Sequence, residues 1–263
     1  MKFWKYCFSI FLLFGCNEQE KKVDIPSTTI PVVYTSTPFL HFTAKFLGGD
    51  LIECIPICKT DPAHCTPSEH TITQMQKANL IVLNGGGYEL WSKTKSLPYS
   101  TTLITGNAFK KEWLYSKEVS HSHGGEDHVH QSSNPYYWMN IELARKQAYQ
   151  IMIQLNKVLP ENETLFRKNF DSYKDSLDLI EEKWSIFLAE NREYPLFCND
   201  EKLGYFCQQF RFSNTEEPIL IQSNSASNKY YFKTYEIDFE SSYFQMHRDN
   251  LNRLKTDLIT SNE

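Results

Sequence analysis

The amino-acid sequence predicts an α/β protein whose N-terminal half forms a doubly wound parallel sheet. Strand-like and helix-like segments alternate in the order β-α-β-α-β between residues 31 and 84. The last of these strands, residues 79–84 (NLIVLN), is almost wholly apolar, which is typical of a parallel strand buried on both faces. Apolar residues then recur at helical spacing over residues 139–158 and 162–190. A chain of 263 residues has room for one large domain or two lobes.

The first β-α-β unit carries a local signal for each element. Residues 31–36 (PVVYTS) are rich in strand-forming side chains, and a Thr-Pro pair follows them. A helix is predicted over residues 39–47, and the two glycines at 48–49 are a typical stop signal. Residues 50–58 (DLIECIPIC) are predicted to form the second strand.

The second helix and the turn after the third strand point to a ligand site. The helix is predicted over residues 67–78, with Pro67 and Ser68 at its start. Three glycines at 85–87 make a sharp turn at the carboxyl end of the apolar strand, which is the edge where ligands of open α/β sheets bind. Glu89, just beyond the turn, is therefore a candidate metal ligand. The alternative is a carboxylate that interacts with the dipole of a following helix.

The C-terminal half is predicted to contain helices and short strands, with Pro160 interrupting the two long helical patterns. The further strands are predicted at 194–197, 217–221 and 230–239, and the further helices at 203–210 and 242–258.

The N-terminus has the features of an export signal. Residues 1–15 contain two lysines followed by an apolar run that is too short to span a bilayer. Residues 13–16 (LFGC) resemble a bacterial lipobox, which implies cleavage before Cys16 and a diacylglyceryl thioether on that cysteine. Residues 16–28 would then form the lipidated anchor and a polar tether. The alternatives are an ordinary signal peptide or a short membrane anchor with an incidental cysteine.

Five cysteines lie beyond the anchor: Cys54, Cys58, Cys65, Cys198 and Cys207. An oxidising envelope permits disulfides, but the sequence does not fix which cysteines pair. An odd number leaves at least one thiol unpaired within the chain. The first three could alternatively be soft metal ligands, although they lack the usual zinc-site spacing.

Composition and motifs exclude several classes of function. The net charge is −5 and the basic residues are scattered, so we expect no nucleic-acid partner. The glycine triplet is not a phosphate loop, because no Lys-Ser/Thr follows it. There is no HExxH or GxSxG motif, and no general base or substrate pocket can be identified for a metallo-hydrolase. We therefore expect that the protein is not an enzyme.

The densest chemical signal is a polar, histidine-rich segment at residues 119–134, which we expect to be a loop. Four of the eight histidines fall within it: His121, His123, His128 and His130. Imidazole is the commonest ligand for borderline metals such as zinc. In an extended chain each His-x-His pair lies on one side. The segment therefore predicts metal binding, and the alternative is a solvated polar loop. His64, between a strand and a helix, is a further candidate ligand at the edge of the sheet.

Two runs of sequence resemble a known family. Residues 67–91 (PSEHTITQMQKANLIVLNGGGYELW) resemble the stretch that leads into an Asn-Gly-x-x-x-Glu-x-Trp element of zinc/manganese ABC-transporter substrate-binding proteins. Residues 120–130 (SHSHGGEDHVH) are similar to the histidine-rich loop of a subgroup of that family. The resemblance spans nearly the whole mature chain. It implies two doubly wound lobes, at 29–160 and 191–263, with a metal cleft between them and a long rigid helix at 161–190 joining them.

The resemblance also implies a changed ligand set. Ala63, Tyr136 and Asp200 occupy positions where the family carries histidine ligands, so a three-histidine site is not available. Asp200 could serve as a carboxylate ligand, or be a solvent-exposed residue at a helix start. Asp238 matches an aspartate of the family's terminal strand. The loop histidines or His64 would complete the site.

The resemblance implies an envelope lipoprotein, facing the periplasm or the exterior, that binds Zn²⁺, or alternatively Mn²⁺, and delivers it to an ABC-transporter permease. Histidine ligands favour zinc, because manganese prefers oxygen. The alternative is a metal-buffering or surface-interaction lipoprotein without a transport partner. That alternative is favoured by a short second lobe, since only 33 residues separate Tyr205 from Asp238.

Overall fold

The computed structural model contains a four-stranded parallel sheet with the strand order β2-β1-β3-β4. The strands are β1 (Val32–Thr35), β2 (Glu53–Pro56), β3 (Leu80–Leu83) and β4 (Thr102–Ile104). The α/β fold class is confirmed, as are the first three strands. β4 is not among the strands that the sequence predicts, since it has three residues and none is fully buried.

The structure describes the chain in nine segments, namely residues 29–59, 64–115, 119–123, 126–130, 133–192, 196–197, 201–211, 230–231 and 242–260. The predicted signal peptide, Cys16, Asp200, Asp238 and the strand predicted at 217–221 lie outside the described residues.

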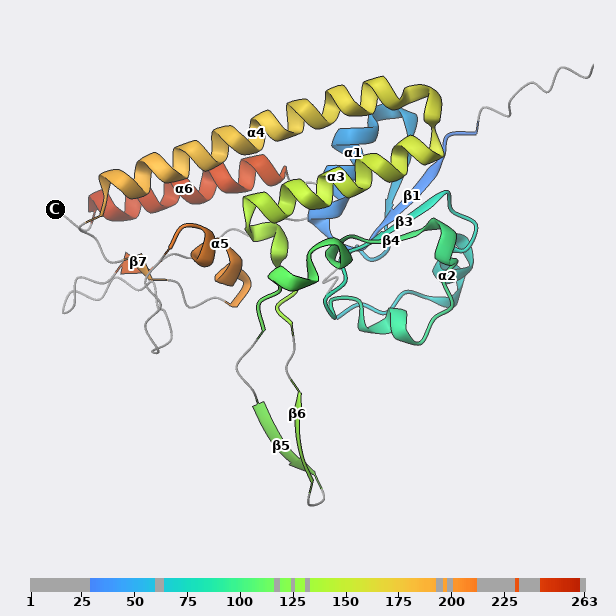
Figure 1. Ribbon diagram of the computed structural model, residues 1–263, viewed down its shortest axis with the longest axis horizontal. Helices are drawn as coiled ribbons and strands as arrows, with labels where there is room; N and C mark the ends of the chain where they lie inside the picture. Colours follow the sequence, from blue (N-terminus) through green and yellow to red (C-terminus); the bar gives the residue numbers. More distant parts are fainter. Residues whose placement is uncertain are drawn as a thin grey trace, which may run out of the picture.

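The sheet is buried on both faces because its strands alternate apolar residues between two cores. Val33 and Val82 contribute to a large core shared with α1 (Pro38–Gly48), α3 (Ile141–Val158) and α4 (Glu163–Glu190). Tyr34 and Ile81, their neighbours in sequence, contribute to a smaller core with Ile72 and Met75 of α2 (Glu69–Met75). Figure 1 shows α1 and α3 on one side of the strands and α2 on the other. This two-sided cover explains the wholly apolar third strand.

α1 begins and ends within one residue of its prediction, whereas α2 begins two residues later and ends three residues earlier than predicted. The Thr37 side chain accepts a hydrogen bond from the Leu40 amide, and Ser68 accepts one from Thr71. Gly49 follows α1 with φ at 54°, a conformation that favours glycine. These short-range signals fix the directions in which the chain enters and leaves the helices.

The long helices connect the two ends of the molecule. α4 has 28 residues and is therefore about 42 Å long. At its N-terminal half Tyr173 packs against Phe46 of α1, and at its C-terminal half Trp184 packs against Phe206 of α5 (Gly204–Gln209). α4 runs alongside α6 (Tyr243–Thr260) in Figure 1. Both long helices that the sequence predicts are therefore present.

The prediction that residues 119–134 form a loop is wrong. The segment contains β5 (Val119–His123) and β6 (Glu126–His130), which pair antiparallel as a hairpin that projects from the body in Figure 1. The polar composition indicates a loop, but pairing between the two strands satisfies the backbone groups that face the partner strand, and polar side chains are compatible with a two-stranded sheet.

The C-terminal region contributes a second parallel pair, β7 (Leu196–Phe197) with β8 (Tyr230–Tyr231). Seven 3-10 helices complete the described elements: η1 (Gly49–Leu51), η2 (Leu90–Lys93), η3 (Tyr99–Thr101), η4 (Thr105–Glu112), η5 (Tyr137–Met139), η6 (Pro160–Asn162) and η7 (Glu201–Leu203).

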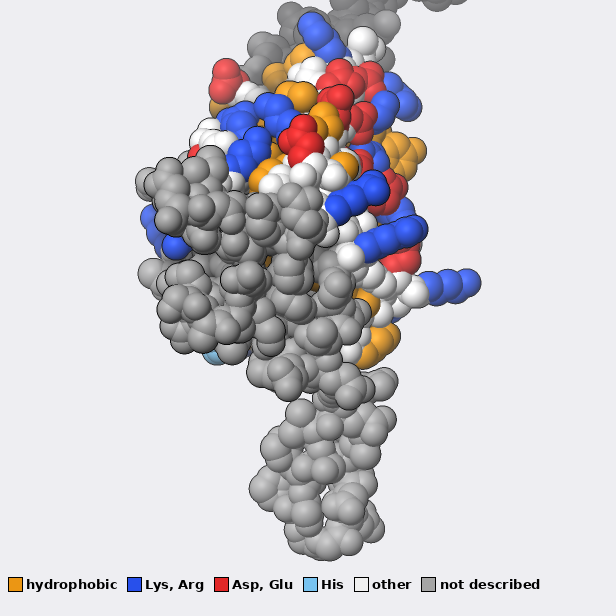
Figure 2. Space-filling view, turned by 90° about the vertical axis from the view of Figure 1, so that its left-hand side faces the viewer, with side chains coloured by type: hydrophobic (Ala, Val, Ile, Leu, Met, Phe, Trp, Pro, Cys, Tyr) orange, Lys and Arg blue, Asp and Glu red, His pale blue; other side chains and the backbone are white. Residues whose placement is uncertain are grey.

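On the face shown in Figure 2, the described basic and acidic side chains are interspersed, and they form no large patch of a single charge. This mixture agrees with the scattered basic residues of the sequence. Within the described part of the chain, no helix combines the length and the apolar character that a membrane crossing requires.

Candidate metal centre

The topology creates a switch point between β1 and β3. From β1 the chain passes to β2 on one side, and it then returns past β1 to β3 on the other side. The connections that leave the carboxyl ends of β1 and β3 therefore diverge, and this is the place on a sheet where α/β proteins commonly bind ligands. Ser36 follows β1 at this edge, and Asn84 and Gly85 follow β3.

Glu89 lies at this edge, and the protein itself occupies both of its carboxylate oxygens. Ser36 donates its hydroxyl to Oε1, the Asn84 amide donates to Oε1 at 2.7 Å, and the Gly85 amide donates to Oε2 at 2.9 Å. The residue is 4% exposed. Burial raises the pKa of Glu89, while the bonds from Ser36 and the two amides act in the opposite direction. In this arrangement Glu89 ties the ends of β1 and β3 together.

The glycine turn packs tightly against one aromatic ring at its middle residue. Gly85, Gly86 and Gly87 have φ values of 86°, 62° and 84°, which disfavour any side chain. A Cβ atom on Gly86 would lie 2.0 Å from the Tyr137 hydroxyl. Ser133 donates a hydrogen bond to the Gly86 carbonyl at 2.7 Å, so the segment before Tyr137 is attached to the turn as well. The turn is therefore fixed in place by the segment that follows the hairpin.

Three aromatic rings cover the same edge. Tyr88, Tyr136 and Trp138 contact one another edge to face, with ring centroids 5.3 to 6.1 Å apart. The Lys202 ammonium of η7 lies 5.8 Å from the centre of the Tyr136 ring. The sequence singles out Tyr136 only through the family resemblance, and it contains no local signal for the contact with Lys202.

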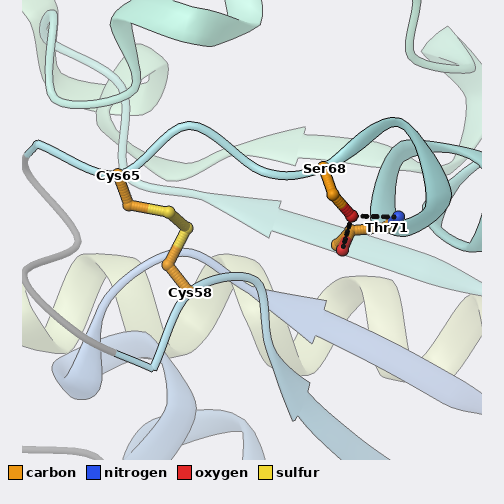
Figure 3. Close-up of a disulfide and its surroundings, with 4 residues drawn as sticks. All are labelled: Cys58, Cys65, Ser68 and Thr71. Atoms are coloured by element: carbon orange, nitrogen blue, oxygen red, sulfur yellow. Dashed lines mark hydrogen bonds between the residues drawn. A yellow bond between two sulfur atoms is a disulfide. The ribbon is translucent and has the colours of Figure 1, made fainter.

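His64 is placed at the edge by a disulfide. Cys58, two residues beyond β2, is bonded to Cys65, and Figure 3 shows this bond beside the capping pair Ser68 and Thr71. His64 is exposed. The bond ties the chain that leads into α2 to the carboxyl end of β2. The alternative of Cys54, Cys58 and Cys65 as soft metal ligands is wrong, because two of the three sulfurs bind each other.

Of the remaining described cysteines, Cys207 is buried and Cys54 is a half-buried free thiol. Burial raises the pKa of Cys54 to about 12, so its thiol stays protonated. Its sulfur lies 3.4 Å from Nδ1 of His41, whose pKa burial lowers to about 4. The pair is therefore neutral and belongs to the core. Cys198 lies outside the described residues.

The hairpin register brings the predicted loop histidines together on one face. His121 stands opposite His128, Val119 opposite His130, and His123 opposite Glu126. Directly opposed residues share a face, and residues two apart along a strand share it too. The four histidines and Glu126 therefore belong to one face of the hairpin, whereas Ser120, Ser122, Asp127 and Val129 belong to the other.

The other described histidines divide by burial. His41 and His247 are buried in helices, and burial lowers the pKa of His247 to about 3. His70 lies exposed on α2. Among the residues whose side chains the structure describes, which do not include those of the hairpin, no group of three or more His, Cys, Asp and Glu is arranged to hold a metal ion.

Comparison with known proteins identifies relatives. Residues 33–230 match the family described as zinc-uptake complex component A, periplasmic (ZnuA). The high-affinity zinc uptake system protein ZnuA of Bacillus subtilis (strain 168) is 25% identical over 249 residues, which cover 91% of this chain and 78% of that protein. The manganese ABC transporter substrate-binding lipoprotein scaA of Streptococcus gordonii is 25% identical over 233 residues, 86% and 65% of the two chains.

Solved structures agree with this assignment at the level of the fold. The crystal structure of the metal-dependent lipoprotein YcdH from Bacillus subtilis matches with a TM-score of 0.66 at 17% identity, over 87% of this chain and 99% of that one. Some curated relatives are much longer, and the chain spans 40% of their length.

Proposed function

The chain belongs to the ZnuA family of periplasmic zinc-uptake components, and from this premise we propose that it captures a divalent transition metal outside the cytoplasm and passes it to a membrane permease. The family comprises metal-binding substrate-binding lipoproteins of zinc- and manganese-type ABC transporters, not enzymes. Zinc is the proposed cargo, with manganese as the second candidate.

The histidine face of the hairpin is the observation that carries this proposal. Four histidines and one glutamate share that face, and opposed residues of an antiparallel pair lie about 4.5 to 5.5 Å apart at their Cα atoms. A zinc ion needs about four nitrogen, sulfur or oxygen ligands in a tetrahedron, and imidazole nitrogens are preferred. His121 and His123 are proposed as direct or delivery ligands, and His128 and His130 as assisting ligands.

A second set of residues is proposed to receive the metal nearer the sheet. His64 is exposed at the carboxyl edge, beside the disulfide. Asp200 and Asp238, which the sequence assigns to a second lobe at 191–263 joined to the first lobe at 29–160 by the helix at 161–190, are offered as carboxylate ligands. Glu89 is proposed to support this second site without binding the metal directly. Both of its carboxylate oxygens already accept hydrogen bonds, and they hold the glycine turn in position.

Attachment to the membrane through a lipid on Cys16 is part of the same proposal. It is supported by the lipobox-like residues 13–16 and by relatives that are named lipoproteins. A single acyl chain binds membranes only marginally, so stable anchoring would need more than one.

A metal-buffering lipoprotein without a transport partner is the second candidate. The aromatic rings and Lys202 at the switch point favour it, because they occupy the edge where a transported ion would be held. The gene neighbourhood separates the two candidates, since an adjacent permease and ATPase would support transport.

The decisive experiment is metal analysis of residues 17–263 with competitive zinc titration. Replacing His121, His123, His128 and His130 together by alanine should weaken zinc binding at least tenfold, or about 1.4 kcal/mol. The matched control replaces Ser120, Ser122, Asp127 and Val129, which belong to the opposite face, and should bind zinc as the parent does. If the variant that lacks the four histidines binds zinc as tightly as the parent, the zinc site must instead involve His64, Asp200 and Asp238.

A further inference from the structure

A short paired segment joins the β5–β6 hairpin to the body of the protein. Tyr115 and Ser133 form an antiparallel bridge in it, and the Asn134 amide donates a hydrogen bond to the Leu114 carbonyl at 2.8 Å. We call residues 114–115 and 133–134 the hairpin root, and Figure 1 shows the hairpin projecting beyond it. Only two residues separate His130 from Ser133 in the sequence, so their Cα atoms are at most about 11 Å apart. The histidine face therefore begins close to the root.

One strand of the root is fixed to the glycine turn by a side chain. The half-buried Ser133 donates its hydroxyl to the Gly86 carbonyl at 2.7 Å. Gly86 has a φ of 62°, and the Tyr88 amide closes the turn by donating a hydrogen bond to the Gly85 carbonyl at 3.1 Å. The Ser133 bond therefore reaches the middle of a turn whose closure can be followed at the Tyr88 amide.

The body of the protein holds the start of the same turn. Asn84 is fully buried, and its side chain accepts a hydrogen bond from Gln147 of α3 at 3.1 Å and donates one to the Pro135 carbonyl at 2.9 Å. The Gly106 amide donates to the Asn84 carbonyl at 2.9 Å. Asn84 thus fixes both the start of the turn and the chain that follows the root, and Ser133 joins the root to the middle of the turn.

We propose that Ser133 is a positioning residue that transmits metal binding on the hairpin to the glycine turn at the switch point. The inference rests on the function proposed above. An ion held by residues of both strands cross-links β5 to β6, because His121 stands opposite His128. A cross-link reduces the conformational freedom of the open state of the neighbouring root, so it favours the paired state. The paired root holds the Ser133 hydroxyl against Gly86, and the turn then opens less often.

Hydrogen exchange of single amides without zinc tests whether Ser133 fixes the root to the turn. The Asn134 amide reports the root, and the Tyr88 amide reports the turn. Ser133→Ala should speed exchange at both amides about fivefold, which corresponds to about 1 kcal/mol, the usual net contribution of one neutral hydrogen bond. Ser133→Thr keeps the hydroxyl, so both amides should exchange at the parent rate.

Two controls separate the loss of this bond from a general loosening of the protein. Ser92→Ala removes a matched bond, in which another half-buried serine donates to a backbone carbonyl at 2.7 Å, and it should leave the Asn134 rate unchanged. The Leu143 amide bonds to Asn140 at the start of α3 at 3.0 Å, so its rate should be the same in every variant. A parent rate at Asn134 in Ser133→Ala would overturn the proposal, as would an equal increase at Asn134 in Ser92→Ala.

The same measurement with saturating zinc tests the transmission. Zinc should slow exchange at the Asn134 and Tyr88 amides of the parent by up to about fivefold, the limit set by the single hydrogen bond that carries the effect. The Tyr88 rate of Ser133→Ala should be insensitive to zinc. The variant in which alanine replaces the four hairpin histidines should show no effect of zinc at either amide.

The outcomes distinguish this inference from the proposed function. An equal effect of zinc at Tyr88 in the parent and in Ser133→Ala would overturn the inference, and so would an effect at Tyr88 that survives the loss of the four histidines. If zinc binds the parent and leaves the Tyr88 rate unchanged, the transmission fails and the proposed function stands. If the parent binds no zinc, the proposed function fails and the transmission fails with it, whereas the metal-free rates still decide whether Ser133 fixes the root.

Discussion

The carboxyl edge of the sheet and the β5–β6 hairpin carry similar ligand-type residues but use them differently. At the edge, Glu89 is 4% exposed and its oxygens bind Ser36 and two amides. On the hairpin, four histidines and a glutamate share one face of a two-stranded sheet that projects from the body. A carboxylate near a switch point is therefore not by itself a metal ligand, because its hydrogen-bond partners decide its role.

The glycine turn is where the edge should be most sensitive to change. Gly86→Ala would place a methyl group 2.0 Å from the Tyr137 hydroxyl at a φ of 62°, so we expect it to reduce the free energy of unfolding by roughly 3–5 kcal/mol. Gly87→Ala is the matched control. It has a similar φ of 84° but no atom within 4 Å, so only the backbone strain of about 1 kcal/mol remains. Denaturant unfolding measures both, and equal losses would refute the steric argument.

The buried histidines should make the scaffold sensitive to acid. Burial lowers the pKa of His247 in the folded protein to about 3, whereas unfolded histidine titrates near 6.5. A lowered folded pKa means that the unfolded chain binds the proton first, so the contribution of His247 is full above pH 6.5 and is lost as the pH falls toward 3. Between pH 6.5 and 4 the free energy of unfolding should fall by roughly 3 kcal/mol from this residue.

His247→Phe isolates that contribution. The ring packs against Tyr243 and Phe206, and its Nε2 has no hydrogen-bond partner among the described atoms, so phenylalanine suits the site. The variant should have a shallower dependence of unfolding free energy on pH between 6.5 and 4. An unchanged dependence would assign the acid sensitivity to other groups.

The Glu89 network should matter less than the turn that it supports. Glu89→Gln keeps the shape of the side chain but turns one acceptor into a donor that faces Ser36 or the amides of Asn84 and Gly85. We expect a loss of about 2 kcal/mol in the free energy of unfolding, as for other buried donors that lose a charged partner. Zinc affinity at the hairpin should stay within twofold of the parent. A tenfold loss of zinc affinity with the stability unchanged would instead make Glu89 a ligand.

The elements that the sequence predicts are those with short-range signals. Thr37, Ser68 and Gly49 act within a few residues of their own position, so the limits of α1 and the start of α2 follow from local chemistry. The bond between Ser36 and Glu89 joins residues 53 apart in the chain, and no local pattern encodes it. The same holds for the contact of Lys202 with Tyr136 and for the pairing of Cys58 with Cys65.

The histidine cluster was predictable in composition but not in arrangement. The spacing of His121 and His123 places them on one side of any extended chain. Their alignment with His128 and His130 depends on a register that the sequence does not specify, because a shift of one residue would move one strand's histidines to the other face.

The hairpin histidines should matter least to the metal-free fold. In our proposal these histidines bind the metal and do not stabilise the fold, so replacing all four by alanine should change the free energy of unfolding without zinc by less than about 0.5 kcal/mol.

Zinc should stabilise the parent protein but not this variant. With zinc at about a hundred times its dissociation constant, the free energy of unfolding of the parent should increase by about 2.7 kcal/mol, and that of the variant should increase much less. That gain should fade as the pH drops through about 6.5, because protonated imidazole cannot bind zinc. Thermal unfolding with and without zinc at pH 7.5 and 5.5 measures all three effects. A metal-free loss above about 1 kcal/mol would show that the hairpin belongs to the scaffold, and the contrast between the two regions would then fail.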